Sequence, residues 1–311
     1  MPDATYDSPY DAVVVGGSWA GLAAAMQLAR ARRRVLVVDA GRPRNRFAAH
    51  AHGFLGQDGR APAAVIADAR AQVLAYPTAE VRADEARHAA AEGGLFAVAL
   101  ASGATARARR LVLATGIVDE LPDVPGLRER WGTGVLHCPY CHGYEVGDRR
   151  LGVLAVGEGS LHQALLLGDW SADVTLFTNG TFAPTAAQRD ALAARGVRVP
   201  ERRVAADVGE APALAGVVVE GADGRAVVAV DAVFTATRTH LAGPLAGQLG
   251  VAVDEGPMGP IIRTDAKRQT TVPGVYAAGD VARAPHNATW AAADGVTAGV
   301  YAHQSLALPA P

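Results

Sequence analysis

The sequence predicts an α/β fold made of two units in which parallel strands alternate with helices. Three observations predict it. The order strand, glycine-rich turn, helix, strand occupies residues 11–39 and returns over residues 151–177, and a pair of cysteines lies between the two copies. Half of the 311 residues are hydrophobic and 19% are charged, so the chain can fill substantial cores. This length suggests about two domains.

The first copy begins with two short apolar runs, residues 12–15 and 35–38, which are rich in β-branched side chains. Such runs are typical of strands buried on both faces of a parallel sheet. A helix is expected at residues 22–30 between them, and Asp39 ends the second strand. An acid at this place can accept hydrogen bonds from the ribose of an adenosine.

The turn before this helix is Gly16-Gly17-Ser18-Trp19-Ala20-Gly21. It matches the fingerprint of a Rossmann-like dinucleotide-binding fold, with Ser18 in place of the middle glycine. Gly16 is expected to make the turn, and Gly21 to let the helix approach the strand. The amides at the start of the helix would then face a pyrophosphate.

Two later segments extend this pattern, Leu111-Val-Leu-Ala-Thr-Gly116 and Gly274-Val-Tyr-Ala-Ala-Gly-Asp280. Both read as buried strands that end in a turn. Together with the first fingerprint and its terminal acid, they resemble the flavoprotein disulfide reductases with two dinucleotide folds. The cysteine pair lies in the middle of the chain, as in the low-molecular-weight thioredoxin reductases.

The resemblance implies that FAD binds the first fold and that the second fold is inserted into the first. Residues 1–117 and 240–311 would form the FAD-binding domain, and residues 118–239 an NADPH-type domain that carries the cysteines. Asp280 would lie near the ribityl chain or phosphate, and His286-Asn287-Ala288 beside the isoalloxazine. The implied cofactor-binding residues are Gly16, Gly17, Ser18, Ala20, Gly21, Asp39, Ala40, Asn45, His52, Ala86, Ala114, Thr115, Gly116, Gly279, Asp280, Asn287 and Ala288.

The second copy departs from the fingerprint in three details. His162 occupies the position expected for the third glycine, where a bulky side chain would hold helix and strand apart. Glu158 lies in the phosphate loop, where its charge would oppose a pyrophosphate. The segment 178–180, Thr-Asn-Gly, stands where NADPH-dependent members of the family carry arginines for the 2′-phosphate. We therefore expect the inserted domain to lack functional nucleotide binding.

Cys138 and Cys141 form a Cys-x-x-Cys pair and are the only cysteines of the chain. Such a pair can open and close as a disulfide, and it lowers the pKa of one thiol, so that the reactive thiolate forms. His142, directly after the second cysteine, could move the proton that this chemistry requires. The segment also fits a haem-attachment motif, a zinc site with His137, or a structural disulfide. We predict a redox centre and no metal.

The run Cys-x-x-Cys-His-Gly-Tyr-Glu over residues 138–145, with residues 52–59, resembles the sulfhydryl oxidases that close disulfides in gliotoxin, holomycin and related dithiols. By this resemblance Cys141 faces the flavin, Cys138 faces the substrate and His142 is the base. The predicted function is an FAD-dependent dithiol oxidase whose electrons pass from the substrate through the cysteines and FAD to O2, giving H2O2. The alternatives are an NADPH- or ferredoxin-dependent thioredoxin reductase and a flavin-bearing redox sensor without turnover.

The charge balance indicates which partners to expect. A net charge of −2 gives no basic footprint for nucleic acid. No apolar run approaches the ~20 residues that cross a bilayer, and the N-terminus lacks the pattern of a signal peptide. We therefore expect a cytoplasmic protein with a small dithiol and O2 as partners, without nucleic acid or membrane. The resemblance also implies a homodimer.

Overall fold

The computed structural model describes residues 8–308. Its larger part, which we call the first unit, is built on a seven-stranded sheet in the order β3-β2-β1-β6-β5-β4, with β18 also paired to β6. The pairs among β3, β2, β1, β6 and β18 are parallel, and those of β5 with β4 and β6 are antiparallel. The strands are β1 (Tyr10–Val15), β2 (Val35–Asp39), β3 (Ala79–Ala83), β4 (Ala86–Glu92), β5 (Leu95–Leu100), β6 (Thr105–Leu113) and β18 (Val275–Ala277).

Alternating side chains of β1 enter the two cores of this unit. Val13 and Val15 pack toward strands β4–β6 and helix α6, whereas Ala12 and Val14 pack against α1 and α7. Burial on both faces explains why the strand is apolar throughout. The helical segments of this unit are α1 (Trp19–Arg30), η1 (Arg44–Phe47), α2 (Pro62–Leu74), α6 (Leu245–Gln248), η3 (Asp280–Ala282) and α7 (Ala288–Ala307).

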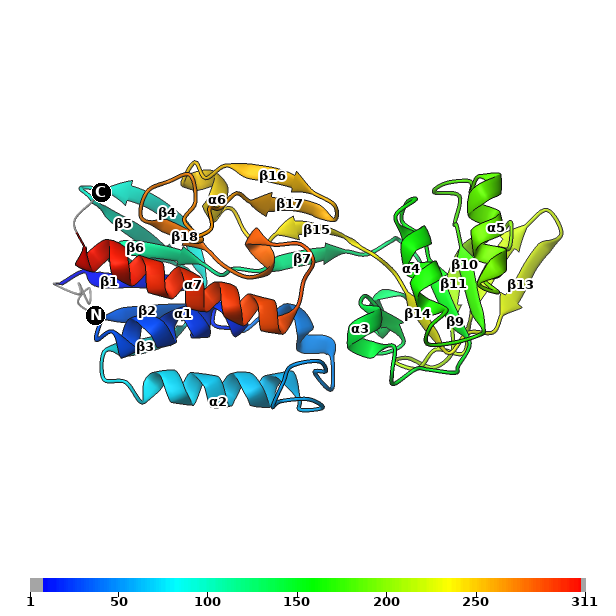
Figure 1. The fold of residues 1–311 in the computed structure, drawn as a ribbon, viewed down its shortest axis with the longest axis horizontal. Helices are drawn as coiled ribbons and strands as arrows, with labels where there is room; N and C mark the ends of the chain where they lie inside the picture. Colours follow the sequence, from blue (N-terminus) through cyan, green and yellow to red (C-terminus); the bar gives the residue numbers. More distant parts are fainter. Residues whose placement is uncertain (1–7, 309–311) are drawn as a thin grey trace.

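Helix α7 lies directly on α1 (Figure 1). Two glycines of α7 make this approach possible. A Cβ atom on Gly295 would lie 2.1 Å from the carbonyl oxygen of Ala20, and one on Gly299 2.5 Å from that of Ala24. The last helix of the chain therefore packs against its first one, backbone on backbone.

The second unit is built on a four-stranded parallel sheet in the order β10-β9-β14-β8. One face of this sheet packs on α4, and the other on an antiparallel sheet of β11, β12 and β13. Its elements are η2 (Arg128–Arg130), β8 (Val135–Leu136), α3 (Pro139–His142), β9 (Leu151–Leu154), α4 (Ser160–Leu167), β10 (Val174–Phe177), α5 (Ala186–Ala194), β11 (Arg203–Val208), β12 (Gly216–Gly221), β13 (Gly224–Val228) and β14 (Ala232–Phe234).

The chain passes between the units along two paired strands, β7 (Ile117–Glu120) and β15 (Arg238–Leu241). They run antiparallel and bridge the two bodies in Figure 1. After β15 the chain forms the hairpin of β16 (Val253–Gly256) and β17 (Gly259–Ile262). We propose that the predicted domain boundaries at 117 and 240 lie on this ladder, and the pairing of Ile117 with Leu241 supports them.

The α/β class and the two Rossmann-like folds are confirmed, but the predicted position of His162 at the third glycine is wrong. Helix α1 buries Gly21 and Leu28 among others, and α4 buries Ser160 and Leu167 at the same spacing. Ser160, only 1% exposed, thus holds the third-glycine position, whereas His162 is exposed. A small side chain stands at the helix–strand contact, so this contact gives no reason to exclude a nucleotide.

Among residues 8–308, no helix combines the length and the apolar character that spanning a membrane requires.

Candidate active site

The cysteine pair lies at the carboxyl edge of the second sheet. Strand β8 ends at Leu136, and the chain passes through His137 into Cys138, which precedes the short helix α3. Cys138 and Cys141 form a disulfide with their Cα atoms 5.2 Å apart, and both residues are half-buried. In parallel α/β sheets this edge is where ligands bind. Figure 1 shows α3 on the side of the second unit that faces the first.

His142 is half-buried directly after the disulfide. Burial lowers the pKa of His142, the carboxylate of Glu145 raises it, and His52 lowers it further, with burial as the largest cause. The net lowering keeps the imidazole neutral near pH 7. A neutral imidazole accepts protons, so this side chain can act as a base toward a thiol.

His52 reaches this segment from the first unit. Its Nε2 atom lies 3.4 Å from Oε1 of Glu145, and its Nδ1 atom 3.6 Å from Oδ2 of Asp58. Phe54 of the same loop packs on Trp19 at the start of α1, with 5.2 Å between the ring centroids. The structure thus brings one predicted cofactor residue, His52, beside the segment that carries the disulfide.

The predicted turn of the first unit meets two other predicted segments. A Cβ atom on Gly16, whose φ is +107°, would lie 2.1 Å from the carbonyl oxygen of Ala114. One on Gly279, with φ +81°, would lie 2.9 Å from Cβ of Ala20. Only glycine fits these contacts, because it has no Cβ atom and readily adopts a positive φ. Three segments far apart in sequence therefore converge at the carboxyl edge of the first sheet.

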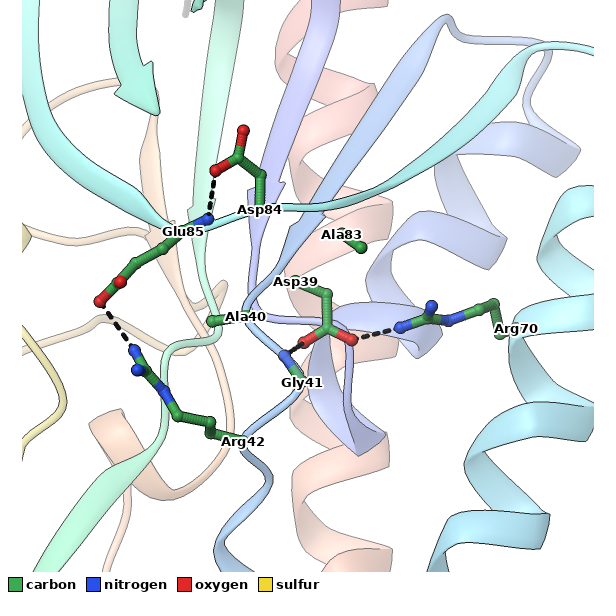
Figure 2. A pocket seen from close by; sticks show the side chains of 8 residues that line it. All are labelled: Asp39, Ala40, Gly41, Arg42, Arg70, Ala83, Asp84 and Glu85. Atoms are coloured by element: carbon green, nitrogen blue, oxygen red, sulfur yellow. Dashed lines mark hydrogen bonds and ion pairs between the residues drawn. The ribbon is translucent and has the colours of Figure 1, made fainter. Parts of the chain in front are cut away.

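A pocket of about 330 Å³ opens beside this turn (Figure 2). Asp39 lies at its centre: its Oδ1 atom accepts a hydrogen bond from the Gly41 amide at 3.1 Å, and its Oδ2 atom pairs with Arg70 of α2. A Cβ atom on Gly17 would collide with the Asp39 carboxyl group at 2.6 Å. The pocket is lined by Asp39, Ala40, Gly41, Arg42, Arg70, Ala83, Asp84 and Glu85.

The other predicted cofactor residues are placed as follows. Ser18 precedes α1, and its side chain makes no capping hydrogen bond. Gly116, with φ +70°, begins the passage into β7 after Ala114 and Thr115.

Asn287 caps α7 by accepting a hydrogen bond from the Thr289 amide at 2.8 Å, and Ala288 starts that helix. Ala86 starts β4 and packs on the core, whereas Ala83, Asp84 and Glu85 line the pocket. Asn45 lies half-buried in η1.

A buried ion-pair cluster beside the disulfide segment is not apparent from the sequence. Arg44 of η1 binds Asp119 of β7 through two hydrogen bonds of 2.8 and 2.6 Å, and its third nitrogen lies 3.4 Å from Asp280. The hydroxyl of Thr237, on the returning connection, donates to Asp119 at 2.7 Å. The only signals in the sequence are an arginine before Asn45 and an acid after an apolar strand. The cluster ties η1 to both connections between the units.

Two histidines border this cluster. Burial and the charge of Arg44 lower the pKa of His137 to about 4, against a smaller opposite effect of Asp119. The same two causes lower the pKa of His286 to about 4. His137 also lies 3.3 Å through Nδ1 from the carbonyl oxygen of Thr235. Both imidazoles are neutral near pH 7.

The end of β10 is the place where a nucleotide phosphate would be recognised in the second unit. The Asn179 side chain accepts a hydrogen bond from the Val204 amide at 3.0 Å. Glu158 lies exposed in the loop before α4 and accepts a hydrogen bond from Gln188 at 2.7 Å. One cation does reach this edge from elsewhere: a Cβ atom on Gly180 would lie 3.6 Å from Nε of Arg203.

A family model described as "Pyridine nucleotide-disulphide oxidoreductase" matches residues 10–295. The chain belongs to this family. It is similar to thioredoxin reductase tcpT of Claviceps purpurea, with 34% identity over 95% of this chain and 94% of that protein. An oxidoreductase from Agrobacterium tumefaciens shares 46% identity over 97% of this chain and all of its own, with a TM-score of 0.91. HlmI shares 43% over 98% and 95%, with a TM-score of 0.88.

Membership settles the broad chemistry of this pyridine nucleotide-disulphide oxidoreductase. The predicted thioredoxin-reductase-like family is confirmed, and its members are flavoproteins that act on disulfide or dithiol substrates. The Cys138–Cys141 disulfide is therefore the redox centre of an oxidoreductase.

Two half-buried histidines of this oxidoreductase, His137 and His286, are expected to make its stability depend on pH. In an unfolded chain His137 and His286 would have a pKa near 6.5, whereas in the folded protein it is about 4. Between these two pH values the unfolded state therefore binds more protons than the folded state. The free energy of unfolding should fall as the pH drops from about 6.5 toward 4, by up to ~1.4 kcal/mol per unit and histidine. Burial raises the pKa of Asp207 to about 6 and also raises the pKa of Asp280, and these two carboxyl groups oppose the effect, whereas the lowered pKa of His142 adds to it.

Urea unfolding at pH 7.5 and pH 5 would measure this loss of stability. In a variant that carries both His137→Gln and His286→Gln, the difference between the two pH values should shrink. An unchanged difference would show that other groups cause the acid sensitivity.

Proposed function

We propose that this oxidoreductase is an FAD-dependent dithiol oxidase that closes an intramolecular disulfide in a small dithiol and passes the electrons to O2. The observation that carries the proposal is the half-buried, neutral His142 directly beside the Cys138–Cys141 disulfide. A base that is neutral near pH 7 next to an oxidised cysteine pair suits attack by an incoming dithiol.

The residues of the first unit fit FAD. The amides that begin α1 have no side-chain cap, so they are available to a pyrophosphate, and the Gly16 and Gly279 backbones leave room for its approach. The carboxylate of Asp39 faces the pocket where an adenosine ribose would accept and donate hydrogen bonds. Asp280, close to Arg44, would hold the ribityl or phosphate part. When bound, FAD supplies a two-electron acceptor that O2 reoxidises with formation of H2O2.

The side chains of the second unit would carry out the exchange with the substrate. His142 takes the proton of one substrate thiol, and the thiolate attacks Sγ of Cys138, which breaks the bond to Cys141. The second substrate thiol then attacks the substrate sulfur of this mixed disulfide, and Cys138 leaves as a thiolate and takes up the proton of that thiol. The substrate leaves oxidised by two electrons, and the two electrons remain on the reduced cysteine pair.

The surroundings of the disulfide favour a small apolar substrate. Tyr140 and Tyr144, on either side of His142 in sequence, are 73% and 88% exposed, and Leu55 of the His52 loop is 96% exposed. Apolar side chains that lie together on a surface mark binding sites, and Tyr140 and Tyr144 belong to the same short segment as the disulfide. The resemblance also implies a homodimer, which light scattering on the eluted protein would test.

The second candidate is an NADPH-dependent disulfide reductase of the thioredoxin reductase type. The buried Ser160, the cation of Arg203 near Gly180 and the name of the relative tcpT favour it. Against it stand the missing arginines in residues 178–180 and the hydrogen bond that occupies Asn179. We propose that the second unit works without a bound nucleotide.

Anaerobic reduction of the purified yellow protein tests the two candidates against each other. The flavin absorbance is followed with dithiothreitol in one cuvette and NADPH in another. We expect rapid bleaching by the dithiol only and, in air, one H2O2 formed per dithiol oxidised. Rapid bleaching by NADPH would support the reductase. Bleaching by the dithiol without turnover in air would leave a redox sensor.

A further inference from the structure

A long polar side chain lies in the buried face of α4. Gln163 is 6% exposed and shares that face with Ser160 and Leu167. Its Nε2 atom donates a hydrogen bond of 2.7 Å to the carbonyl oxygen of His137, the residue before Cys138. In the part of the chain that the structure describes, its Oε1 atom is buried and has no hydrogen-bond partner. Within that part of the chain, the bond to His137 is therefore the one hydrogen bond of this buried amide.

The Rossmann-like fold itself does not require a glutamine at this position. The two units bury their first helices with the same spacing, so that Ser160 of α4 corresponds to Gly21 of α1. Three residues later, Gln163 corresponds to Ala24, which is fully buried. Burying a glutamine costs side-chain freedom and desolvation that an alanine avoids. The bond to the disulfide segment, which the first unit does not contain, explains why a glutamine stands here.

The hydrogen bond from Gln163 lies where the backbone ladder of the second sheet ends. The Leu136 carbonyl accepts a hydrogen bond from the Thr235 amide at 2.9 Å, at the end of the pairing of β8 with β14. The next carbonyl, that of His137, accepts from Gln163. The His137 ring lies 3.3 Å through Nδ1 from the Thr235 carbonyl oxygen. Both the backbone and the ring of the residue before Cys138 are thus bound to the second unit.

The other end of the disulfide segment is fixed by different contacts. Helix α3 lies beside α4 (Figure 1). The Gly143 amide donates to the Pro139 carbonyl oxygen at 2.6 Å. A Cβ atom on Gly143 would lie 2.9 Å from Nε1 of Trp170, so the indole packs directly on this backbone. The position of Cys138, at the start of the segment, therefore depends on the hydrogen bond from Gln163.

We propose that Gln163 is a positioning residue that holds Cys138 where its thiol can close the disulfide with Cys141. The proposal rests on the disulfide as the redox centre, and it applies to the oxidase and to the reductase alike. In the oxidised protein the covalent bond restrains both cysteines with or without Gln163. In the dithiol only the surrounding contacts restrain them, so loss of the hydrogen bond gives freedom mainly to the dithiol form. Gln163 therefore shifts the equilibrium toward the disulfide.

The equilibrium of the purified holoprotein with glutathione measures this shift. One protein disulfide and two glutathione thiols give one protein dithiol and one glutathione disulfide, so two electrons pass to the cysteine pair. Anaerobic samples at graded glutathione ratios are alkylated with iodoacetamide, and their free thiols are counted by mass spectrometry. In Gln163→Met, which keeps the side-chain length but cannot donate, the dithiol should be favoured about fivefold, the factor typical of one hydrogen bond.

Gln163→Ala tests whether the hydrogen bond or the volume of the side chain matters, and it places at this position the residue that α1 carries. Both variants lose the donor, so both should shift the equilibrium by the same factor. A shift in the alanine variant only, or in neither, would overturn the proposal.

Gln163→Glu makes the same hydrogen bond depend on pH. At pH 8 the carboxylate cannot donate, and the equilibrium should match that of Gln163→Met. As the pH falls toward 6, the carboxyl group takes up a proton, because burial raises its pKa, and it can donate to His137 again. The difference from the unaltered protein should therefore shrink. A difference that stays constant over this range would contradict the proposed hydrogen bond.

Ser171→Ala is the matched control in the same unit. Ser171 is 4% exposed, and its hydroxyl donates to the Arg149 carbonyl oxygen at 2.5 Å, before β9 begins and hence at the opposite edge of the sheet. This variant should leave the glutathione equilibrium unchanged. An equal shift would show that any loss of a buried hydrogen bond moves the equilibrium, and the proposal would fail. If NADPH and not dithiols reduces the flavin, the proposed oxidase fails, and the glutathione measurement still decides the role of Gln163.

Discussion

Replacing Cys141 by serine is expected to leave the flavin bound and to lower its rate of reduction by dithiols at least ~1,000-fold, the size typical of losing a reactive side chain. The disulfide with Cys138 is the only one the sequence can form within the chain. Without Cys141 no internal disulfide exists to receive the substrate electrons. Flavin absorbance after anaerobic addition of dithiothreitol measures the effect.

Cys138→Ser is the paired variant that separates the two cysteines. If Cys138 faces the substrate, the free thiol in Cys141→Ser should react with an aromatic disulfide reagent faster than the free thiol in Cys138→Ser. Equal reactivity would contradict the assignment of roles. Normal flavin reduction in Cys141→Ser would contradict the whole path from substrate through the cysteine pair.

Arg44→Met is expected to destabilise the protein by roughly 3–5 kcal/mol, as breaking a buried ion pair from one side does. The Arg44 and Asp119 side chains are 19% and 7% exposed, and Asp280 is the second carboxylate of the cluster. Without the guanidinium, the buried carboxylate of Asp119 and the largely buried one of Asp280 lose their cation. The change in the free energy of unfolding by urea at pH 7.5 gives the magnitude.

Two comparisons make this prediction specific. Arg263 forms an ion pair with Asp254 on the surface, with side chains 57% and 42% exposed, and Arg263→Met should cost less than ~1 kcal/mol. Adding Asp119→Leu to Arg44→Met should recover part of the loss, because it removes one stranded charge. A loss no larger than that of Arg263→Met would show that the cluster does not hold the connections.

The first fold was predictable because its signals are local. Gly16, Gly21 and Asp39 lie within 24 residues, and each is required by the backbone or by the end of a strand. The position of the third glycine in the second fold was predicted wrongly because the prediction also relied on a local pattern. Gly157 and Gly159 reproduce the spacing of Gly16 and Ser18, but the strand ends earlier, at Leu154. Ala155 and Ser160 therefore occupy the positions that correspond to Gly16 and Gly21. A search for glycines alone does not find them.

The junction between the units was less predictable because it depends on pairs that are distant in sequence. Arg44 meets Asp119 across 75 residues, and His52 meets Glu145 across a comparable separation. Nothing in the neighbourhood of Arg44 distinguishes it from the other arginines of the segment. The disulfide itself was predictable, since Cys138 and Cys141 stand three positions apart in the sequence and no distant partner is needed to form it. The role of His142 stays a prediction.

The close packing of α7 on α1 has a consequence for how the protein is made. Ribosomes deliver the chain from its N-terminus, so the inserted second unit is complete before β18 and α7 exist. Until then β6 lacks its partner β18. The face of α1 around Ala20 and Ala24, which Gly295 and Gly299 of α7 cover in the complete protein, also stays uncovered. The first unit is thus begun first and completed last during synthesis. A chain that ends after residue 241 would contain every strand and helix of the second unit but would lack β18 and α7 of the first.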